Sequence, residues 1–269
     1  MIELKSVSGS CYKGNVSDVS FRLPNGKTYG VFSSCYADAV ALLALMGGAR
    51  TPLSGSILAG GFDLHREAKQ ARRGIAYLGA DLLPDDELTP IEYLMTVADT
   101  LELNYDKTVR RAHELLELAD LADQKEKLIA NLSMGEKRAL TILQLLLGKP
   151  EILILTSPLS GVTPKDAQKI RNLIRFLSDT YTVFLCTPST HDLCDMCNEI
   201  IVLQDGALKT VLPSCDEALA KEFFSTSSNT SSINSSEPAK KQGASRWKML
   251  LQNSGEYEVL DENEKEDKN

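Results

Sequence analysis

Residues 132–164 read LSMGEKRALTILQLLLGKPEILILTSPLSGVTP and combine a helix, a strand and a polar loop. Apolar residues recur at helical spacing over about 135–147, which predicts a helix with one buried face. The run EILIL at 151–155 is continuously apolar between turn residues, as is typical of a strand buried on both faces. A helix that leads into such a strand indicates an α/β fold with a largely parallel sheet.

Strand and helix patterns alternate over most of the remaining chain. Helical spacing recurs at 90–103, at 106–119 and after Pro164, and TVFLC at 182–186 is a second buried strand. The N-terminal runs IELKSV and VSDVSFRL alternate apolar and polar residues, which predicts antiparallel strands forming an edge of the sheet. A hairpin is expected around Asp205-Gly206 near the end of this region.

Composition changes sharply near residue 222. We predict a globular domain at 1–222, with a helical subdomain at about 80–135, and a Ser-rich flexible tail at 223–269. The tail contains ASRWKMLLQ, a short amphipathic segment. This segment either docks on a partner or membrane surface or is a fragment of disordered tail, and the sequence leaves both readings open.

Charge and cysteine content exclude several classes of function. The net charge of −8 and the pI of about 5.1 argue against nucleic acid as a partner, since phosphate backbones require basic patches. The N-terminus has no signal-like segment, and no apolar run reaches the roughly 18 residues of a membrane span. Six cysteines in such a chain are expected to be reduced thiols. We therefore expect a cytoplasmic protein that can still dock onto a membrane protein.

Residues 29–48, YGVFSSCYADAVALLALMGG, have the frame of a phosphate-binding loop: a strand, a short polar turn and an apolar helix. Such a loop needs glycines in the turn, and then a Lys and a Ser or Thr at the start of the helix. Those places hold Ser33, Asp38, Ala39 and Val40. We therefore interpret this loop as a packing element, with Tyr36 and Ala37 filling the cradle.

The 132–164 segment resembles the signature helix, buried strand and following loop of ATP-binding cassette (ABC) ATPases, the motor subunits of ABC transporters. That family reads roughly LSGGQ, a helix, P-E/D, an apolar strand, D-E-P and S-G-L-D. When the two patterns are aligned on this segment, residues 29–48 correspond to the Walker A loop. The Q-loop region corresponds to residues 65–94, HREAKQARRGIAYLGADLLPDDELTPIEYL, and the last hairpin to residues 198–208, NEIIVLQDGAL. The resemblance covers about residues 1–212 and implies a P-loop NTPase-like ABC ATPase fold with antiparallel N-terminal strands and a helical subdomain.

The resemblance also implies that this member is degenerate, because the catalytic positions hold the wrong side chains. Ala39 and Val40 replace the Walker A lysine and hydroxyl residue, and Thr156 and Ser157 replace the magnesium-ordering carboxylate and the catalytic glutamate. The remaining degenerate positions are Ala80 at the Q-loop glutamine and Pro188 at the switch histidine.

Asp38 is also expected to repel a phosphate group, because its carboxylate stands where the family resemblance places a phosphate of ATP. Two like charges about 4 Å apart cost roughly 4 kcal/mol at an effective dielectric near 20. That energy corresponds to a several-hundred-fold loss of affinity.

Some parts of the family pattern are kept. Tyr12 falls where the family stacks an aromatic ring on adenine, although a tyrosine at a strand end is as often ordinary packing. Ser133 and Gly135 preserve the hydroxyl and the close-approach glycine of the signature, which implies contact with ATP held by a partner subunit. Ser133 followed by Glu136 is also a helix-capping pattern, and the two roles can coexist. Met134 and Thr163 depart from the family's glycine and D-loop aspartate and weaken the partner-ATP reading.

Two rival readings concern the segment around His191. A shifted alignment would place His191 on the switch position, at the cost of three extra residues before it. The spacing of His191, Cys194 and Cys197 could also suit zinc, but no fourth ligand is evident.

Taken together, the sequence predicts a catalytically inactive ABC cassette, a pseudo-ATPase, on the inner face of the cell membrane. The expected partners are an ABC ATPase, in a hetero- or homodimer, and a membrane permease subunit, without nucleic acid. No metal and no cofactor of its own are predicted, and ATP shared with a partner subunit is the nucleotide that the resemblance allows. The alternatives are a cassette-fold scaffold for protein interactions with no nucleotide role, and a weak ATPase.

Overall fold

The structure, a computed structural model, describes residues 1–213. The tail predicted at 223–269 lies outside the described residues. Within the described part the chain forms two compact units, one of residues 1–82 with 149–213 and one of residues 83–148. No helix of the described residues is long and apolar enough to cross a membrane.

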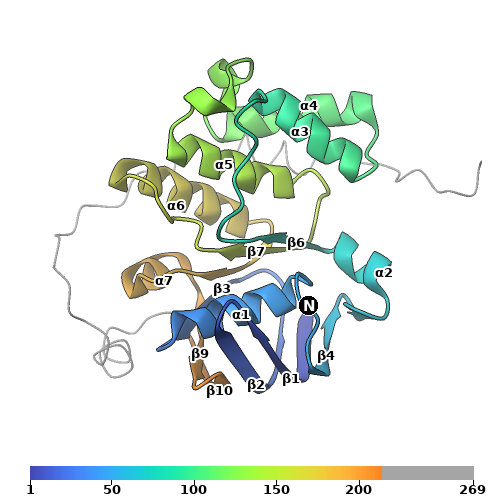
Figure 1. Ribbon diagram of the computed structural model, residues 1–269, viewed down its shortest axis with the longest axis vertical. Coiled ribbons are helices and arrows are strands. Elements are labelled where there is room, and N and C mark those ends of the chain that lie inside the picture. Colours follow the sequence, from blue (N-terminus) through green and yellow to red (C-terminus); the bar gives the residue numbers. More distant parts are fainter. Residues whose placement is uncertain (214–269) are drawn as a thin grey trace, which may run out of the picture. The chain divides into compact units, whose positions relative to one another are not determined.

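A six-stranded sheet forms the centre of the first unit, in the order β10-β9-β3-β8-β7-β6 (Figure 1). Its strands are β3 (Thr28–Ser33), β6 (Ile75–Leu78), β7 (Ile152–Thr156), β8 (Thr182–Cys186), β9 (Glu199–Gln204) and β10 (Ala207–Pro213). All neighbours are parallel except β9 and β10. Every residue of β7 and β8 is buried, so the continuous apolar runs are confirmed as strands with both faces covered.

The N-terminal strands form a second, antiparallel sheet in the order β2-β1-β4-β5. It consists of β1 (Ile2–Cys11), β2 (Gly14–Leu23), β4 (Ser54–Ala59) and β5 (Phe62–Asp63). The prediction that the N-terminal strands form an edge of the parallel sheet was wrong, because β1 is paired on both sides, with β2 and β4. The antiparallel edge of the large sheet is β10 instead, which returns along β9 after the turn at Asp205 and Gly206.

Helix α1 (Tyr36–Met46) packs against strands of both sheets. Eight of its eleven residues are buried, so the helix is part of the core rather than a surface helix. Leu42, Leu43 and Leu45 are fully buried in this core. The remaining helices of the first unit are α2 (Ala68–Arg73), α6 (Pro164–Ser178) and α7 (Thr190–Met196).

The second unit is helical. It contains α3 (Pro90–Thr100), α4 (Tyr105–Leu118) and α5 (Met134–Leu145), with short 3-10 turns at Ala122–Gln124 and Ile129–Asn131. Thr89 begins α3 through a capping box with Glu92, and Pro90 occupies the first turn as predicted. In the buried interior of the unit, the Tyr93 hydroxyl donates to Gln144 Oε1 over 2.6 Å. The unit extends to Gly148 and therefore includes the signature helix α5.

The turn between β1 and β2 lies directly on the start of α1. A Cβ atom at Gly14 would come within 1.9 Å of the carbonyl oxygen of Ala37. Only a residue without a side chain allows this approach, which is backbone against backbone and leaves little room for adjustment.

We predict that Gly14→Ala lowers the free energy of unfolding by about 2–3 kcal/mol, because the added methyl group forces the turn away from α1. Urea unfolding followed by circular dichroism measures the change. Gly74→Ala is the control, since the nearest atom to its Cβ lies 3.7 Å away. Equal stability of the two variants would show that the turn does not rest on the helix.

Candidate functional site: the loop between β3 and α1

The connection between β3 and α1 is very short. Strand β3 ends at Ser33 and α1 begins at Tyr36, so Asp38, Ala39 and Val40 belong to the helix itself. Cys35 is the N-cap residue and its side chain makes no capping hydrogen bond. The first turn of α1 therefore depends on other groups to satisfy its amino end.

Asp38 provides a negative charge at this end of the helix. Its side chain is buried, Oδ1 accepts from the Asn15 backbone N–H over 2.8 Å, and Oδ2 accepts from the Ser33 hydroxyl over 3.3 Å. The amino end of a helix favours an anion, and here the anion is the chain's own carboxylate. An external phosphate would meet both this negative charge and the turn that Asp38 holds.

Tyr36 reaches across the ends of two neighbouring strands. Its hydroxyl is hydrogen-bonded to Ser157 Oγ, directly after β7, and lies 3.4 Å from Cys186 Sγ, the last residue of β8. Burial raises the pKa of Tyr36, and the neighbouring Cys186 raises it further. A neutral phenol thus contacts the position where the family resemblance places a catalytic glutamate.

The other predicted positions also lack charged groups. Thr156 is fully buried at the end of β7, and Ala39 is fully buried in α1. Tyr77 on the neighbouring strand β6 packs against the end of α1, where a Cβ at Gly47 would lie 2.5 Å from its ring. Ala39, Thr156 and Ser157 therefore carry methyl and hydroxyl groups, which do not replace a carboxylate as a magnesium ligand.

Ala80 and Pro188 lie in loops that follow strands of the same sheet. Ala80 is half-buried two residues after β6, and Pro188 is exposed between β8 and α7. His191 is exposed on the second residue of α7.

The cysteine-rich segment of α7 does not form a metal site in the described part of the chain. No group of three His, Cys, Asp or Glu side chains among residues 1–213 is placed to hold a metal ion. Cys197 is buried against Gly30, and burial raises the pKa of its thiol. Cys194 is disulfide-bonded, so the expectation that all six cysteines are reduced thiols was wrong at this position.

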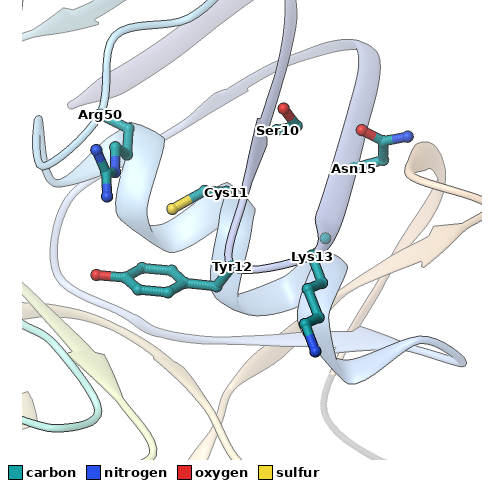
Figure 2. A pocket seen from close by; sticks show the side chains of 7 residues that line it. Ser10, Cys11, Tyr12, Lys13, Asn15 and Arg50 are labelled. Atoms are coloured by element: carbon teal, nitrogen blue, oxygen red, sulfur yellow. The ribbon is translucent and has the colours of Figure 1, made fainter.

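Tyr12 projects from the turn between β1 and β2, and its side chain is 56% exposed. The guanidinium of Arg50 lies over its ring, 5.9 Å from the ring centroid, and Figure 2 shows both side chains on the same side of the turn. The exposed ring is thus available to a ligand and is not used in core packing.

Ser133 and Gly135 lie at the start of α5 in the helical unit. The Ser133 hydroxyl accepts from the Glu136 N–H over 3.2 Å, while Glu136 Oε2 accepts from the Ser133 N–H over 2.7 Å. This reciprocal pair is the capping box that the sequence predicts. Gly135 is buried, whereas Ser133 is exposed and its O–H remains available as a donor.

Comparison with known protein families identifies the family of this chain. The family model described as "ABC transporter" matches residues 16–160. The chain belongs to this family. The match includes α1, the helical unit and β7, up to the loop after Ser157.

Curated relatives support the same assignment. The chain is 28% identical over 228 residues to the methionine import ATP-binding protein MetN of Streptococcus thermophilus, covering 78% of this chain and 64% of the relative. It is 26% identical over 194 residues to the linearmycin resistance ATP-binding protein LnrL of Bacillus subtilis, covering 72% and 62%. The chain thus spans less than two thirds of the length of these relatives.

Solved structures confirm the ABC ATPase fold. The chain resembles cbiO1 from Clostridium perfringens, described as part of the ABC transporter complex cbiONQ, with a TM-score of 0.70 and 18% identity over 84% of this chain and 93% of that one. The ATP-binding cassette MJ0796 bound to ADP and Pi gives a TM-score of 0.68 and 20% identity, covering 80% and 99%.

Sequence reasoning missed the contacts that occupy the loop. Tyr36 is separated from Ser157 by 121 residues and from Cys186 by 150, and Asn15 is 23 residues from Asp38. No local sequence pattern predicts hydrogen bonds between residues so far apart in the chain. Arg50 was also missed, because an arginine after a helix carries no spacing signal.

We predict that Tyr36→Phe lowers the free energy of unfolding by about 1–2 kcal/mol at neutral pH, because the buried Ser157 and Cys186 side chains lose a partner. The raised pKa of Tyr36 adds a pH dependence. Below the ordinary tyrosine value of 10.0 its contribution is fully present, and above that value the unfolded chain loses the phenol proton first, so stability falls.

Urea unfolding between pH 7 and about 11 tests both parts, since the phenol of an unfolded chain titrates near pH 10. Tyr36→Phe is expected to flatten the alkaline loss, whereas Tyr105→Phe, at an exposed position, is expected to leave it unchanged. A Tyr36→Phe curve parallel to the wild-type curve would contradict the assignment.

Proposed function

We propose that this chain is a degenerate ABC cassette, a pseudo-ATPase that acts as a structural and regulatory subunit beside a catalytic ABC ATPase and a membrane permease. The observation that carries this proposal is the buried Asp38 carboxylate, bound to Asn15 and Ser33 at the start of α1. A loop that already holds an internal anion is a poor site for the phosphates of ATP.

The chemistry of phosphoryl transfer supports the same conclusion. Transfer depends on positioning and on charge stabilisation by a lysine and a metal ion. Ala39 cannot neutralise a phosphate, and Thr156 and Ser157 offer no carboxylate to order a metal or a water molecule. Several such losses in one site remove both contributions together.

The proposed location and partners follow from the relatives. MetN is described as an import ATP-binding protein, and cbiO1 as part of an ABC transporter complex. We propose that this chain likewise works at the cytoplasmic face of a membrane and docks a permease through the region 79–103. Ser133 and Gly135 would face ATP that is held by the catalytic partner, so the chain needs no cofactor of its own.

We predict that the purified chain shows no Mg²⁺-dependent ATP hydrolysis and no Mg²⁺-dependent ATP binding at millimolar ATP. Phosphate release and isothermal titration measure the two quantities, with MetN of Streptococcus thermophilus as the active control. Mg²⁺-dependent turnover above a blank, abolished by Ser157→Ala, would establish the weak ATPase instead.

The partner role predicts that crosslinking in cells captures an ABC ATPase subunit and a permease. Met134→Arg is expected to weaken ATPase capture about tenfold or more, because it adds charge at the start of α5 while the Ser133–Glu136 capping box stays intact. Met134 is 39% exposed, so the fold should tolerate the change.

Glu117→Arg, at an exposed position near the end of α4, is the matched control and is expected to leave capture unchanged. Absence of any ABC subunit among the crosslinked proteins would overturn the partner role. Capture of other proteins alone would favour the scaffold alternative.

A further inference from the structure

A basic surface lies on α2 and on the turns beside it. Residues 48–73 contain five Lys or Arg side chains and two carboxylates, whereas the whole chain has a net charge of −8. The five cationic side chains are exposed, and none of them forms a salt bridge with another residue of 1–213. We call this set the α2 basic surface; its members are Arg50, Arg66, Lys69, Arg72 and Arg73.

Hydrogen bonds connect the parts of this surface. The Arg72 guanidinium donates to the carbonyl oxygen of Gly48, two residues before Arg50, over 3.4 Å. In the turn before α2, Asp63 Oδ1 accepts from the Arg66 backbone N–H over 2.9 Å. Strand β5, which carries Asp63, also packs against α2. The cations therefore lie on adjoining elements of the first unit.

The two carboxylates in this region are bound to backbone N–H groups. Asp63 accepts from Arg66 and from His65, and these hydrogen bonds lower the pKa of its carboxyl group. Glu67 Oε2 accepts from the Asp63 N–H over 3.0 Å. Burial lowers the pKa of His65, so this side chain is neutral at pH 7. The charge of the surface thus comes from its Lys and Arg side chains, which outnumber the carboxylates.

The same chain contains a segment of opposite charge. Residues 256–267, EYEVLDENEKED, have seven carboxylates and one lysine. This segment lies outside the described residues, and its charge follows from the sequence. It also contains Tyr257, Val259 and Leu260, and Phe62 on β5 offers an apolar contact beside α2 because its side chain is 42% exposed.

The position of Pro213 brings this segment within reach of α2. Pro213 ends β10 and pairs with Glu199 at the start of β9, whereas α2 leads through Gly74 into the start of β6 at the opposite edge of the same sheet (Figure 1). Five strand spacings of about 4.8 Å separate β10 from β6, which amounts to about 24 Å. A flexible chain of roughly 40 residues, the number between Pro213 and Glu256, has a root-mean-square span of about 35 Å.

We propose that residues 256–267 bind the α2 basic surface of the same chain. Exposed ion pairs are individually weak, so an untethered acidic peptide would occupy this surface poorly. The connection through residues 214–255 raises the effective concentration of the segment to the order of millimolar, which favours this occupant over a free one. The inference does not rest on the proposed function, because it uses neither the loop at α1 nor the start of α5.

The test is zero-length crosslinking of the full chain with a water-soluble carbodiimide at low salt, followed by peptide mass spectrometry. Lys69 is the only lysine of the α2 basic surface, so the expected product is an amide between Lys69 Nζ and a carboxylate of 256–267. The ion pair of Lys137 with Asp86 in the helical unit is the internal standard. Raising the ionic strength from about 0.05 to 0.5 M should lower the Lys69 product at least about fivefold relative to this standard.

Reversing the charge of the surface should have the same effect. Arg66→Glu, Arg72→Glu and Arg73→Glu together keep Lys69 and are expected to lower its product about tenfold. The matched control is the combination of Arg110→Glu, Lys165→Glu and Lys169→Glu, which changes the net charge equally at exposed positions of α4 and α6. This control should change the product by less than about twofold.

A charge swap separates loss of binding from loss of folding. Asp261→Lys, Glu262→Lys and Glu264→Lys, added to the surface variant, restore opposite charges and leave four carboxylates in the segment. We expect the Lys69 product to recover to within about threefold of the wild-type yield, which a misfolded surface could not do.

Absence of the Lys69 product in the wild type, or a yield that neither salt nor the surface variant changes, would overturn the inference. Products from 256–267 that fall mainly on lysines of other surfaces would also overturn it. A mixture of ¹⁵N-labelled and unlabelled chains shows whether the amide joins two molecules; mainly mixed products would place the segment on a second copy and contradict binding within one chain. Each of these results leaves the pseudo-ATPase proposal intact.

Discussion

The Asp38 carboxylate at the amino end of α1 is the interaction on which the candidate site depends. A helix start favours negative charge, and Asp38 supplies it from within the first turn. Because Asn15 and Ser33 donate to this carboxylate, the turn between β1 and β2 is held against the helix. Gly14, the neighbour of Asn15 in that turn, approaches the Ala37 backbone at the same end of the helix.

Tyr36 links the first turn of α1 to the ends of strands β7 and β8. The family resemblance places metal-ordering and catalytic carboxylates at these strand ends, and the Tyr36 phenol joins Ser157 and Cys186 there. Buried polar groups are costly unless they are paired, and these neutral groups pair with one another. Stability of this region is therefore expected not to require a bound ligand, which is compatible with the structural role that we propose.

Several elements followed directly from local sequence. The apolar runs of β7 and β8, the proline at the start of α3 and the capping pair Ser133–Glu136 all predicted what the structure contains, since these signals act over a few residues. The sheet edge was predicted wrongly. Alternation of apolar and polar residues indicates a half-buried strand, but it does not indicate which strands pair with it. In the structure β1 pairs with β2 on one side and with β4 on the other.

The sequence by itself determined the α/β class, the family resemblance and the absence of charged groups at Ala39, Thr156 and Ser157, because these depend on residue identity and order. Only the tertiary structure decided what takes their place. Asp38 with Asn15, Tyr36 with Ser157 and Arg50 with Tyr12 are contacts between separate elements. Their partners are set by how strands and helices pack, and packing is a property of the whole chain rather than of any local pattern.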